Sequence, residues 1–87
     1  MPLFMDMHSI EGGVRAADVA GAHEADLASQ GAYGVQYLRY WLDEEAGKIF
    51  CLVDAPDAEA ANTVHREAHG LVADAIYPVV EGTEGFH

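Results

Sequence analysis

Segments with the hydrophobic pattern of strands and of helices follow one another in the order strand, helix, strand, strand, helix, strand, and this order constrains the fold more than any other feature. A chain of 87 residues has room for a single hydrophobic core. Its one cysteine, Cys51, excludes an internal disulfide, so the core has to stabilise the fold. Because small cores are marginal, oligomerisation or a bound metal ion is a common supplement at this size.

The first half of the chain contains two of the predicted strands and a helix. Residues 3–8 alternate with the period of a half-buried strand. An alanine-rich segment predicts a helix over residues 14–30, with Gly31 as its stop. Residues 35–42 are rich in aromatic and β-branched side chains, which favour a second strand.

The second half begins with a hairpin and repeats the pattern. A turn at residues 43–48 joins the second strand to a third at residues 49–53. Asp57 is a good N-cap for a helix over residues 58–69, which carries an apolar stripe along one side. Residues 76–80 supply the last strand.

This order predicts a ferredoxin-like α+β sandwich of βαββαβ topology, in which two helices cover one face of a four-stranded antiparallel sheet. Residues 1–81 form the single domain, and residues 82–87 are expected to be a polar tail. The other face of the sheet is left bare and partly apolar, and such a patch usually marks a protein contact. We therefore expect a symmetric homodimer through the open face of the sheet.

The charge of the chain excludes two classes of partner. Fifteen acidic residues against four scattered basic ones give a formal net charge of −11, so nucleic acid and anionic membrane surfaces are disfavoured. The longest apolar run, residues 49–53, is far too short to cross a bilayer, and no leader pattern is visible. A cytoplasmic location follows by default, and the lone cysteine fits a reducing compartment.

Histidine is the residue type that points to chemistry. His65 and His69 are four positions apart on the second predicted helix, close enough for two imidazoles to share a metal ion, although such a pair is often only the wet edge of a helix. The first strand and the second helix run the same way, which makes His8 a neighbour of His69. Asp6 lies on the same side of its strand as His8 and adds an oxygen ligand; the alternative is an Asp–His pair on a solvated or dimer-facing surface.

Two further side chains are candidate ligands. His23 is followed after three positions by Asp26, a spacing that binds metal, orients an imidazole through a carboxylate, or makes an ordinary surface hydrogen bond. Cys51 lies in mid-strand, where a buried inert thiol and a single thiolate ligand are both open. Imidazole with carboxylate support suits nickel, zinc, copper or cobalt better than calcium or magnesium.

Motifs of nucleophilic or phosphate-binding enzymes are absent from the sequence, because neither the glycines nor the serines stand in such a pattern. Aromatic residues of the second strand leave an alternative open. This alternative is a small dimeric α+β enzyme or ligand-binding module with an apolar pocket near Tyr37 and Trp41, in which His65 or His8 acts as acid or base. A third alternative is a dimeric adaptor that binds an unknown protein partner and whose metal binding is incidental.

Short motifs over nearly the whole chain form a shared pattern. They lie at residues 4–8, 22–26, 34–35, 40–41, 50–53 and 55–56, and above all in Val-His-Arg-Glu-Ala-His-Gly-Leu at 64–71. In these motifs the chain resembles a small bacterial family of nickel-binding, nickel-responsive proteins that was first catalogued as a domain of unknown function. The resemblance implies a ferredoxin-like homodimer. It also implies that the family's characteristic positions include Asp6, His8, His23, Cys51, His65 and His69, without saying which of them touch the ion.

The expected function is therefore nickel binding by a cytoplasmic homodimer, through imidazole and carboxylate ligands and without a need for catalysis. The role would be storage, buffering or response to metal load. The candidate ligands are His65, His69, His8, Asp6, His23 and Cys51.

Overall fold

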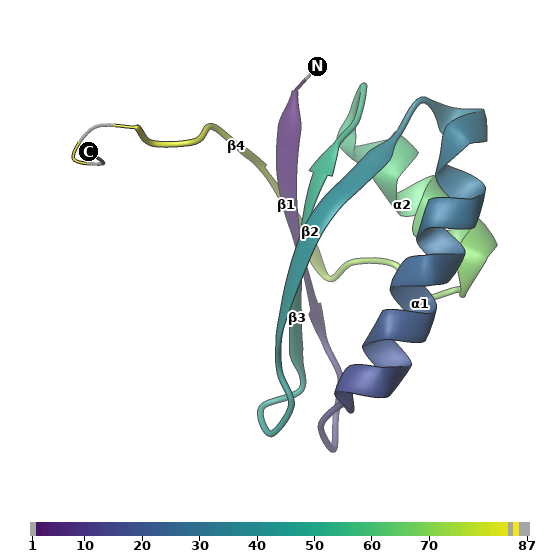
Figure 1. Ribbon diagram of the computed structural model, residues 1–87, viewed down its shortest axis with the longest axis vertical. Helices are drawn as coiled ribbons and strands as arrows, with labels where there is room; N and C mark the ends of the chain where they lie inside the picture. The colour runs from purple at the N-terminus through teal and green to yellow at the C-terminus, as the bar shows by residue number, and fades with distance from the viewer. Residues whose placement is uncertain (1, 84, 86–87) are drawn as a thin grey trace.

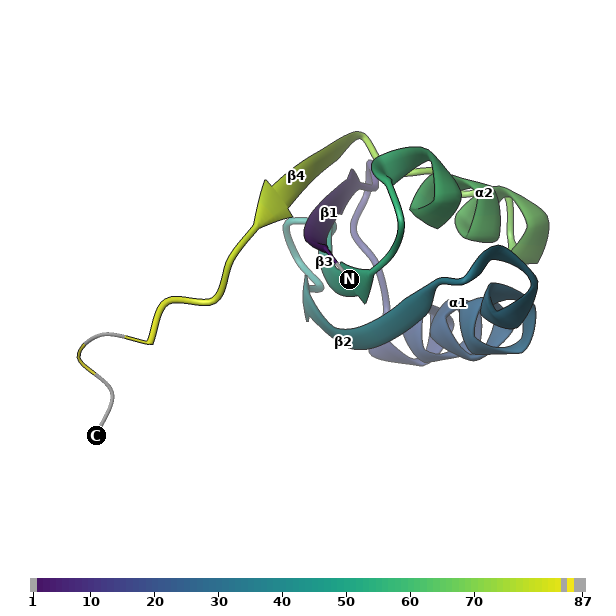
Figure 2. The same cartoon turned by 90° about the horizontal axis from the view of Figure 1, so that it is seen from above.

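One sheet and two helices make up the molecule, which we describe from a computed structural model that covers residues 2–83 and 85 (Figure 1). The four strands are antiparallel in the order β2-β3-β1-β4, and both helices lie on one side of the sheet (Figures 1 and 2). The predicted βαββαβ sandwich is confirmed. Its strands are β1 (Leu3–Ser9), β2 (Gln36–Asp43), β3 (Lys48–Asp54) and β4 (Ala75–Val79), and its helices are α1 (Ala16–Ser29) and α2 (Ala58–Ala68).

The alternation of β1 decides which side chains face the helices. Asp6 and His8 are buried and lie opposite Cys51 and Ile49 of β3, which are also buried. We call this helix-covered side of the sheet the inner face and the other side the open face. Phe4 continues the inner face along β1, so the strand places a carboxylate and an imidazole inside the molecule.

A β-bulge in β2 interrupts the alternation that the sequence suggested. Pairing shifts between Tyr37 and Arg39, so that Tyr37 lies opposite Val53 and Tyr40 lies opposite Cys51. Tyr37 is buried, and Tyr40 packs against the core. Because the extra residue changes the phase of the strand, Trp41 turns to the open face.

The first helix starts later than the sequence predicted, and a 3₁₀ turn carries the helical segment beyond the expected end. Helix α1 begins at Ala16, two residues after the expected start, and is extended by the 3₁₀ turn η1 (Gln30–Tyr33). Gly31, the expected stop, lies inside that turn. The chain leaves it at Gly34, whose φ of 66° is in the left-handed region and whose N–H donates to the carbonyl of Gln30.

Helix α2 has the boundaries that its capping residues indicate. The Asp57 side chain accepts a hydrogen bond of 2.8 Å from the N–H of Ala60 at the start of the helix. The helix ends at Ala68, one residue before the expected end, and Gly70 with a φ of 82° donates its N–H to the carbonyl of His65. Ala61, Val64 and His65 form its buried side.

The core fills the space between the inner face and the helices. Beyond β4 the described chain runs away from the body of the molecule (Figures 1 and 2). The expected tail at 82–87 falls partly on residues 84, 86 and 87, which lie outside the described residues. No helix in the described part of the chain has the length and apolar character needed to cross a membrane. The buried hydrophobic residues are Val19, Val35, Tyr37, Ile49, Cys51, Val53, Ala55, Ala61 and Val64.

Candidate metal centre

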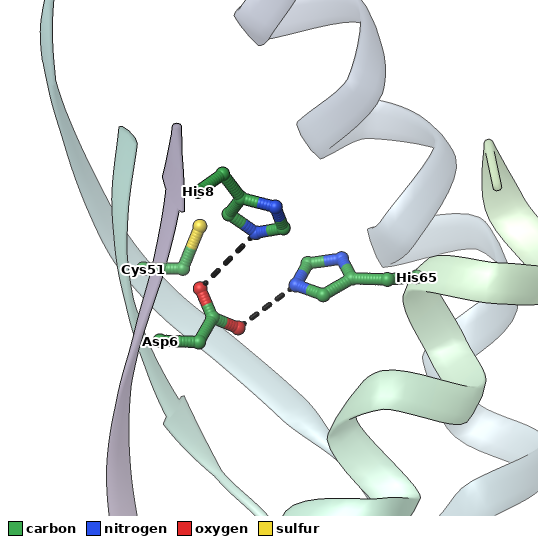
Figure 3. A group of neighbouring side chains, drawn as sticks. All are labelled: Asp6, His8, Cys51 and His65. Atoms are coloured by element: carbon green, nitrogen blue, oxygen red, sulfur yellow. Dashed lines mark hydrogen bonds and ion pairs between the residues drawn. The ribbon is translucent and has the colours of Figure 1, made fainter. Parts of the chain in front are cut away.

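Four buried side chains from three elements meet on the inner face (Figure 3). Their ligand atoms, a carboxylate oxygen, two ring nitrogens and a sulfur, all lie within 4.8 Å of one another. We call them the inner donor set. It consists of Asp6 and His8 on β1, Cys51 on β3 and His65 on α2.

Asp6 is the central member of this set. Its carboxylate is fully buried, and Oδ2 lies 2.8 Å from Nε2 of His65. The other oxygen, Oδ1, has no hydrogen bond within the described residues and lies 3.3 Å from Nε2 of His8. This oxygen has only the long ion-pair contact with His8 to offset its burial, so it is a natural ligand for a cation.

A second group of titratable side chains adjoins the first and shares His65. Asp26 of α1 is buried, and its Oδ1 lies 3.0 Å from Nδ1 of His65 and 3.0 Å from Nε2 of His69. We call Asp26, His65 and His69 the outer group. His65 therefore faces the inner donor set with Nε2 and the outer group with Nδ1.

A backbone hydrogen bond fixes the role of His69. The N–H of Leu71 donates to Nδ1 of His69 at 3.1 Å, so this nitrogen is an acceptor. The neutral ring then carries its proton on Nε2, and this N–H donates a hydrogen bond to Oδ1 of Asp26. His69 thus has no free nitrogen lone pair to offer an ion in this arrangement.

The Tyr37 hydroxyl contacts both Asp6 and His65. Its hydroxyl donates to the carbonyl oxygen of Ala61 at 3.0 Å and lies 2.8 Å from Nε2 of His65. It also lies 3.3 Å from Oδ2 of Asp6. These contacts hold the carboxylate and the imidazole in place.

The two central groups shift each other's titration. Burial by itself would raise the pKa of Asp6, but the hydrogen bonds and positive charge of His65 and His8 outweigh it and lower this pKa to about 2. Burial by itself would lower the pKa of His65, but hydrogen bonds to Asp26 and Asp6 raise it to about 9. In the metal-free protein His65 is therefore a buried imidazolium between two carboxylates.

The pKa values of the Cys51 thiol and the Tyr37 phenol are both raised. Burial, together with the negative charge of Asp6, raises the pKa of Cys51 and of Tyr37 well above their usual range. Cys51 is therefore a neutral thiol in the metal-free protein, and a bound cation would favour its ionisation to a thiolate.

A cavity of about 260 Å³ borders both groups. It lies between α1 and the inner face, and its lining includes four of the histidines, His8, His23, His65 and His69, together with Cys51. Three members of the inner donor set, His8, Cys51 and His65, therefore border this space, whereas Asp6 lies behind them and is fully buried.

Folding brings together five of the six predicted ligands, but in a different arrangement from the expected one. The ring of His8 contacts that of His65, with centroids 4.8 Å apart, instead of pairing with His69 as expected. Asp6 and His8 face the helices and not a dimer surface. Both differences arise because β1 turns these side chains under α2.

His23 lies in the same cavity but belongs to neither group. Its ring packs on Tyr40, with centroids 4.6 Å apart, and Asp26 interacts with His65 and His69 instead of with His23.

The apolar pocket that the sequence suggested near Tyr37 and Trp41 lies elsewhere in the structure, because neither residue lines the cavity. Trp41 is 47% exposed and does not line the cavity, because the bulge turns it outward.

Sequence reasoning missed the roles of Tyr37 and Asp26. Tyr37 gave no signal beyond its place in an aromatic strand, because the bulge that points it inward leaves no clear mark. Asp26 did give one: it lies seven residues after the buried Val19, two helical turns along the same face of α1. A carboxylate at a core position of a helix needs a buried partner.

The donor types fit a divalent transition metal. Two imidazoles, one carboxylate and one thiol suit nickel, zinc, copper or cobalt, whereas calcium and magnesium prefer oxygen-only shells. Oδ1 of Asp6, which lacks a hydrogen bond within the described residues, and the closeness of the four ligand atoms agree with this fit.

Comparison with known proteins identifies a family and a similar solved structure. Residues 4–79 match the family described as nickel responsive protein SCO4226-like. The crystal structure of SCO4226 from Streptomyces coelicolor A3(2) is 37% identical in sequence and has a TM-score of 0.86, over 93% of this chain and 99% of that one. A search of curated proteins found no match. The match over residues 4–79 shows that the chain belongs to the SCO4226-like family of nickel-responsive proteins.

Proposed function

We propose that the protein binds nickel in its inner donor set, for storage, buffering or response to metal load. The observation that carries this proposal is the convergence of four buried ligand atoms from β1, β3 and α2 within 4.8 Å. The family's description as nickel responsive supports nickel among the ions that these ligands suit. Asp6, His8, His65 and Cys51 are the proposed ligands, and no catalysis is required.

The outer group orients the inner one in this proposal. Nδ1 of His65 donates to Asp26, which leaves Nε2 free to hold an ion and raises its basicity. The Nε2–H of His69 donates a hydrogen bond to the same carboxylate, that of Asp26. Asp26 and His69 therefore position His65 without coordinating the ion themselves.

Charge balance explains how an ion replaces a proton. The metal-free site holds two buried carboxylates, Asp6 and Asp26, and one imidazolium at His65. A dication that displaces the proton of His65 neutralises both carboxylates. Ionisation of Cys51 as a ligand then returns one negative charge, so the loaded site carries no excess positive charge.

We further propose that the protein is a homodimer in the cytoplasm. Trp41 and Phe50 lie side by side on the open face and are 47% and 37% exposed, and Tyr77 of β4 is 58% exposed on the same face. A second copy would cover this apolar surface through a two-fold axis. A free cysteine fits the reducing interior of a cell.

Calorimetric titration of nickel into the full chain, with a competing chelator, tests the site. We expect His65→Gln to lower the nickel affinity by at least about a hundredfold and Asp26→Asn by about 10- to 100-fold, because the first loses a ligand and the second only its orientation. His69→Gln should have the smaller effect of an orienting residue.

His23→Gln is the matched control, because it removes an imidazole from the same cavity but from outside both groups. We expect its nickel affinity to equal that of the wild type. Equal loss in His23→Gln and His65→Gln, with both variants folded by circular dichroism, would contradict the assigned ligands. The metal content of protein purified without an affinity tag or added metal then shows which ion the site selects.

A further inference from the structure

The cavity beside the inner donor set is much larger than one metal ion requires. Its 260 Å³ would hold on the order of eight water molecules at about 30 Å³ each. It is still smaller than the cavities of roughly 300–1,000 Å³ that hold drug-sized ligands. The space fits one small organic molecule of about one ring.

The walls of the cavity are suited to an organic body and not to water. Aliphatic side chains offer no hydrogen bonds, so water molecules in this space lose partners that an apolar ligand does not need. The aliphatic lining comes from α1, the loop before it, β3 and the segment after α2. It consists of Ile10, Val14, Val19, Ala22, Ile49 and Leu71.

Three members of the inner donor set border this space. His8, Cys51 and His65 line the cavity from the sheet and from α2. Helix α1 lines it with the aliphatic Val19 and Ala22 and also with the titratable Asp18, His23 and Asp26. An ion held by the inner donor set would therefore border a cavity whose wall is aliphatic in part. Any coordination position that the protein ligands leave open toward this space could take a further ligand.

Charge selects the kind of ligand that can take such a position. With Asp6 and Asp26 balanced by a dication, the site has no positive charge left over, and Asp18 adds a carboxylate to the lining. A carboxylate ligand would be repelled, while an uncharged nitrogen donor gains a coordinate bond without a charge penalty.

We propose that the cavity binds a small uncharged organic molecule with an aromatic nitrogen, which coordinates the metal ion and packs its ring on the aliphatic wall. This inference rests on the proposed nickel site. The protein then handles nickel together with an organic coligand instead of the bare ion. The donor replaces a water molecule on the ion, and the rest of the molecule fills the cavity beside Ala22.

Titration of the nickel-loaded full chain with 4-ethylpyridine tests the inference at about pH 8, where this probe is uncharged. Ethylbenzene has the same size and shape but no nitrogen, and it is the matched control ligand. We expect 4-ethylpyridine to shift the visible absorption of the bound nickel in a saturable way, and ethylbenzene to leave it unchanged.

Two substitutions on α1 separate the cavity from the ion. Ala22→Leu adds bulk to the cavity wall at a residue outside both groups, and we expect it to weaken 4-ethylpyridine binding by at least about tenfold while nickel affinity stays within about threefold. Ala17→Leu places the same side chain on the exposed side of the helix and should leave both affinities unchanged.

The outcomes distinguish this inference from the function on which it rests. Nickel binding with no spectral shift on adding 4-ethylpyridine, or with an equal shift in Ala22→Leu, overturns the coligand and leaves the metal site standing. Absence of nickel binding to the folded wild type overturns both.

Discussion

At the scale of single residues, the centre of the molecule holds three charged side chains in contact, with His65 between Asp6 and Asp26. These side chains are 1%, 0% and 3% exposed, so each depends on the others and not on water. One proton or one dication at His65 satisfies both carboxylates. The same residues therefore stabilise the metal-free protein and, in the proposed function, would position ligands for the ion.

The stability of the metal-free protein should depend on pH through these two groups. The pKa of His65 rises from 6.5 to about 9 on folding, so its contribution is complete below pH 6.5 and is lost as pH rises through 9. The pKa of Asp6 falls from 3.8 to about 2, so its contribution is present above pH 3.8 and is lost as pH falls through 2. Stability is expected to be highest between about pH 4 and 6.5.

Urea unfolding of metal-free protein measures this dependence. Between pH 6.5 and 9 we expect the free energy of unfolding to fall by about 3 kcal/mol through His65. His65→Gln cannot carry the proton, so its unfolding free energy should lack this slope. Parallel curves for the two proteins would show that His65 is not a buried imidazolium.

Cys51 gives a prediction that separates a ligand from a core residue. Without metal it is a buried neutral thiol, so Cys51→Ser should change the free energy of unfolding by only about 1 kcal/mol. With nickel, a thiolate ligand gives a charge-transfer band in the near ultraviolet that serine cannot give. An unchanged band in Cys51→Ser would remove Cys51 from the ligands.

At the scale of elements, two close turns hold β1 and the β2–β3 hairpin together. Gly47 has a φ of 69°, and its carbonyl accepts a hydrogen bond of 2.7 Å from the N–H of Ile10. A Cβ atom at Gly47 would overlap the backbone oxygen of Ile10. This contact joins the end of β1 to the hairpin and so supports the strand that carries Asp6 and His8.

Substitution of glycine by alanine should therefore have opposite effects at two positions. Gly47→Ala combines a positive φ with a backbone clash, and we expect it to cost at least about 2 kcal/mol of stability. Gly21→Ala lies within α1 with open space around its Cβ, and we expect a gain of about 0.5–1 kcal/mol. Thermal unfolding of the two variants measures both; a stable Gly47→Ala would mean that the turn rearranges at little cost.

At the scale of the whole molecule, the sheet separates two functions. Its inner face carries the inner donor set and the core, and its open face carries exposed aromatic side chains. Trp41 and Phe50 are paired across β2 and β3, so the aromatic surface is continuous from strand to strand. Dimerisation and metal binding are therefore expected to be independent in this fold.

Sedimentation equilibrium tests the dimer. We expect Phe50→Glu to convert the wild-type dimer to monomer while nickel affinity per chain stays the same, because the substitution buries a charge in the interface but its side chain points away from the inner face. Leu27→Glu changes an equally exposed apolar residue on α1 and should remain dimeric. A wild-type protein that sediments as a monomer at tens of micromolar would end the dimer proposal.

Local sequence was sufficient for the elements and for the types of ligand. Strand alternation, the Asp57 cap and the glycine after α2 predicted the order of elements to within a few residues, because these signals depend only on nearby positions. The four-residue spacing of His65 and His69 also needed no tertiary information. That residues 1–81 fold as one independent domain stays a prediction.

Tertiary structure decided which of these side chains meet and what each nitrogen can do. The bulge in β2 turned Tyr37 inward and Trp41 outward, packing of α1 on α2 brought Asp26 to His65, and the Leu71 backbone took the free nitrogen of His69. The contact between Leu71 and His69 is local, since the two residues are two positions apart, but the contacts of Tyr37 and Asp26 are not encoded by neighbouring residues. They depend on the packing of segments up to 59 positions apart, as between Asp6 and His65, and only the folded core sets those distances.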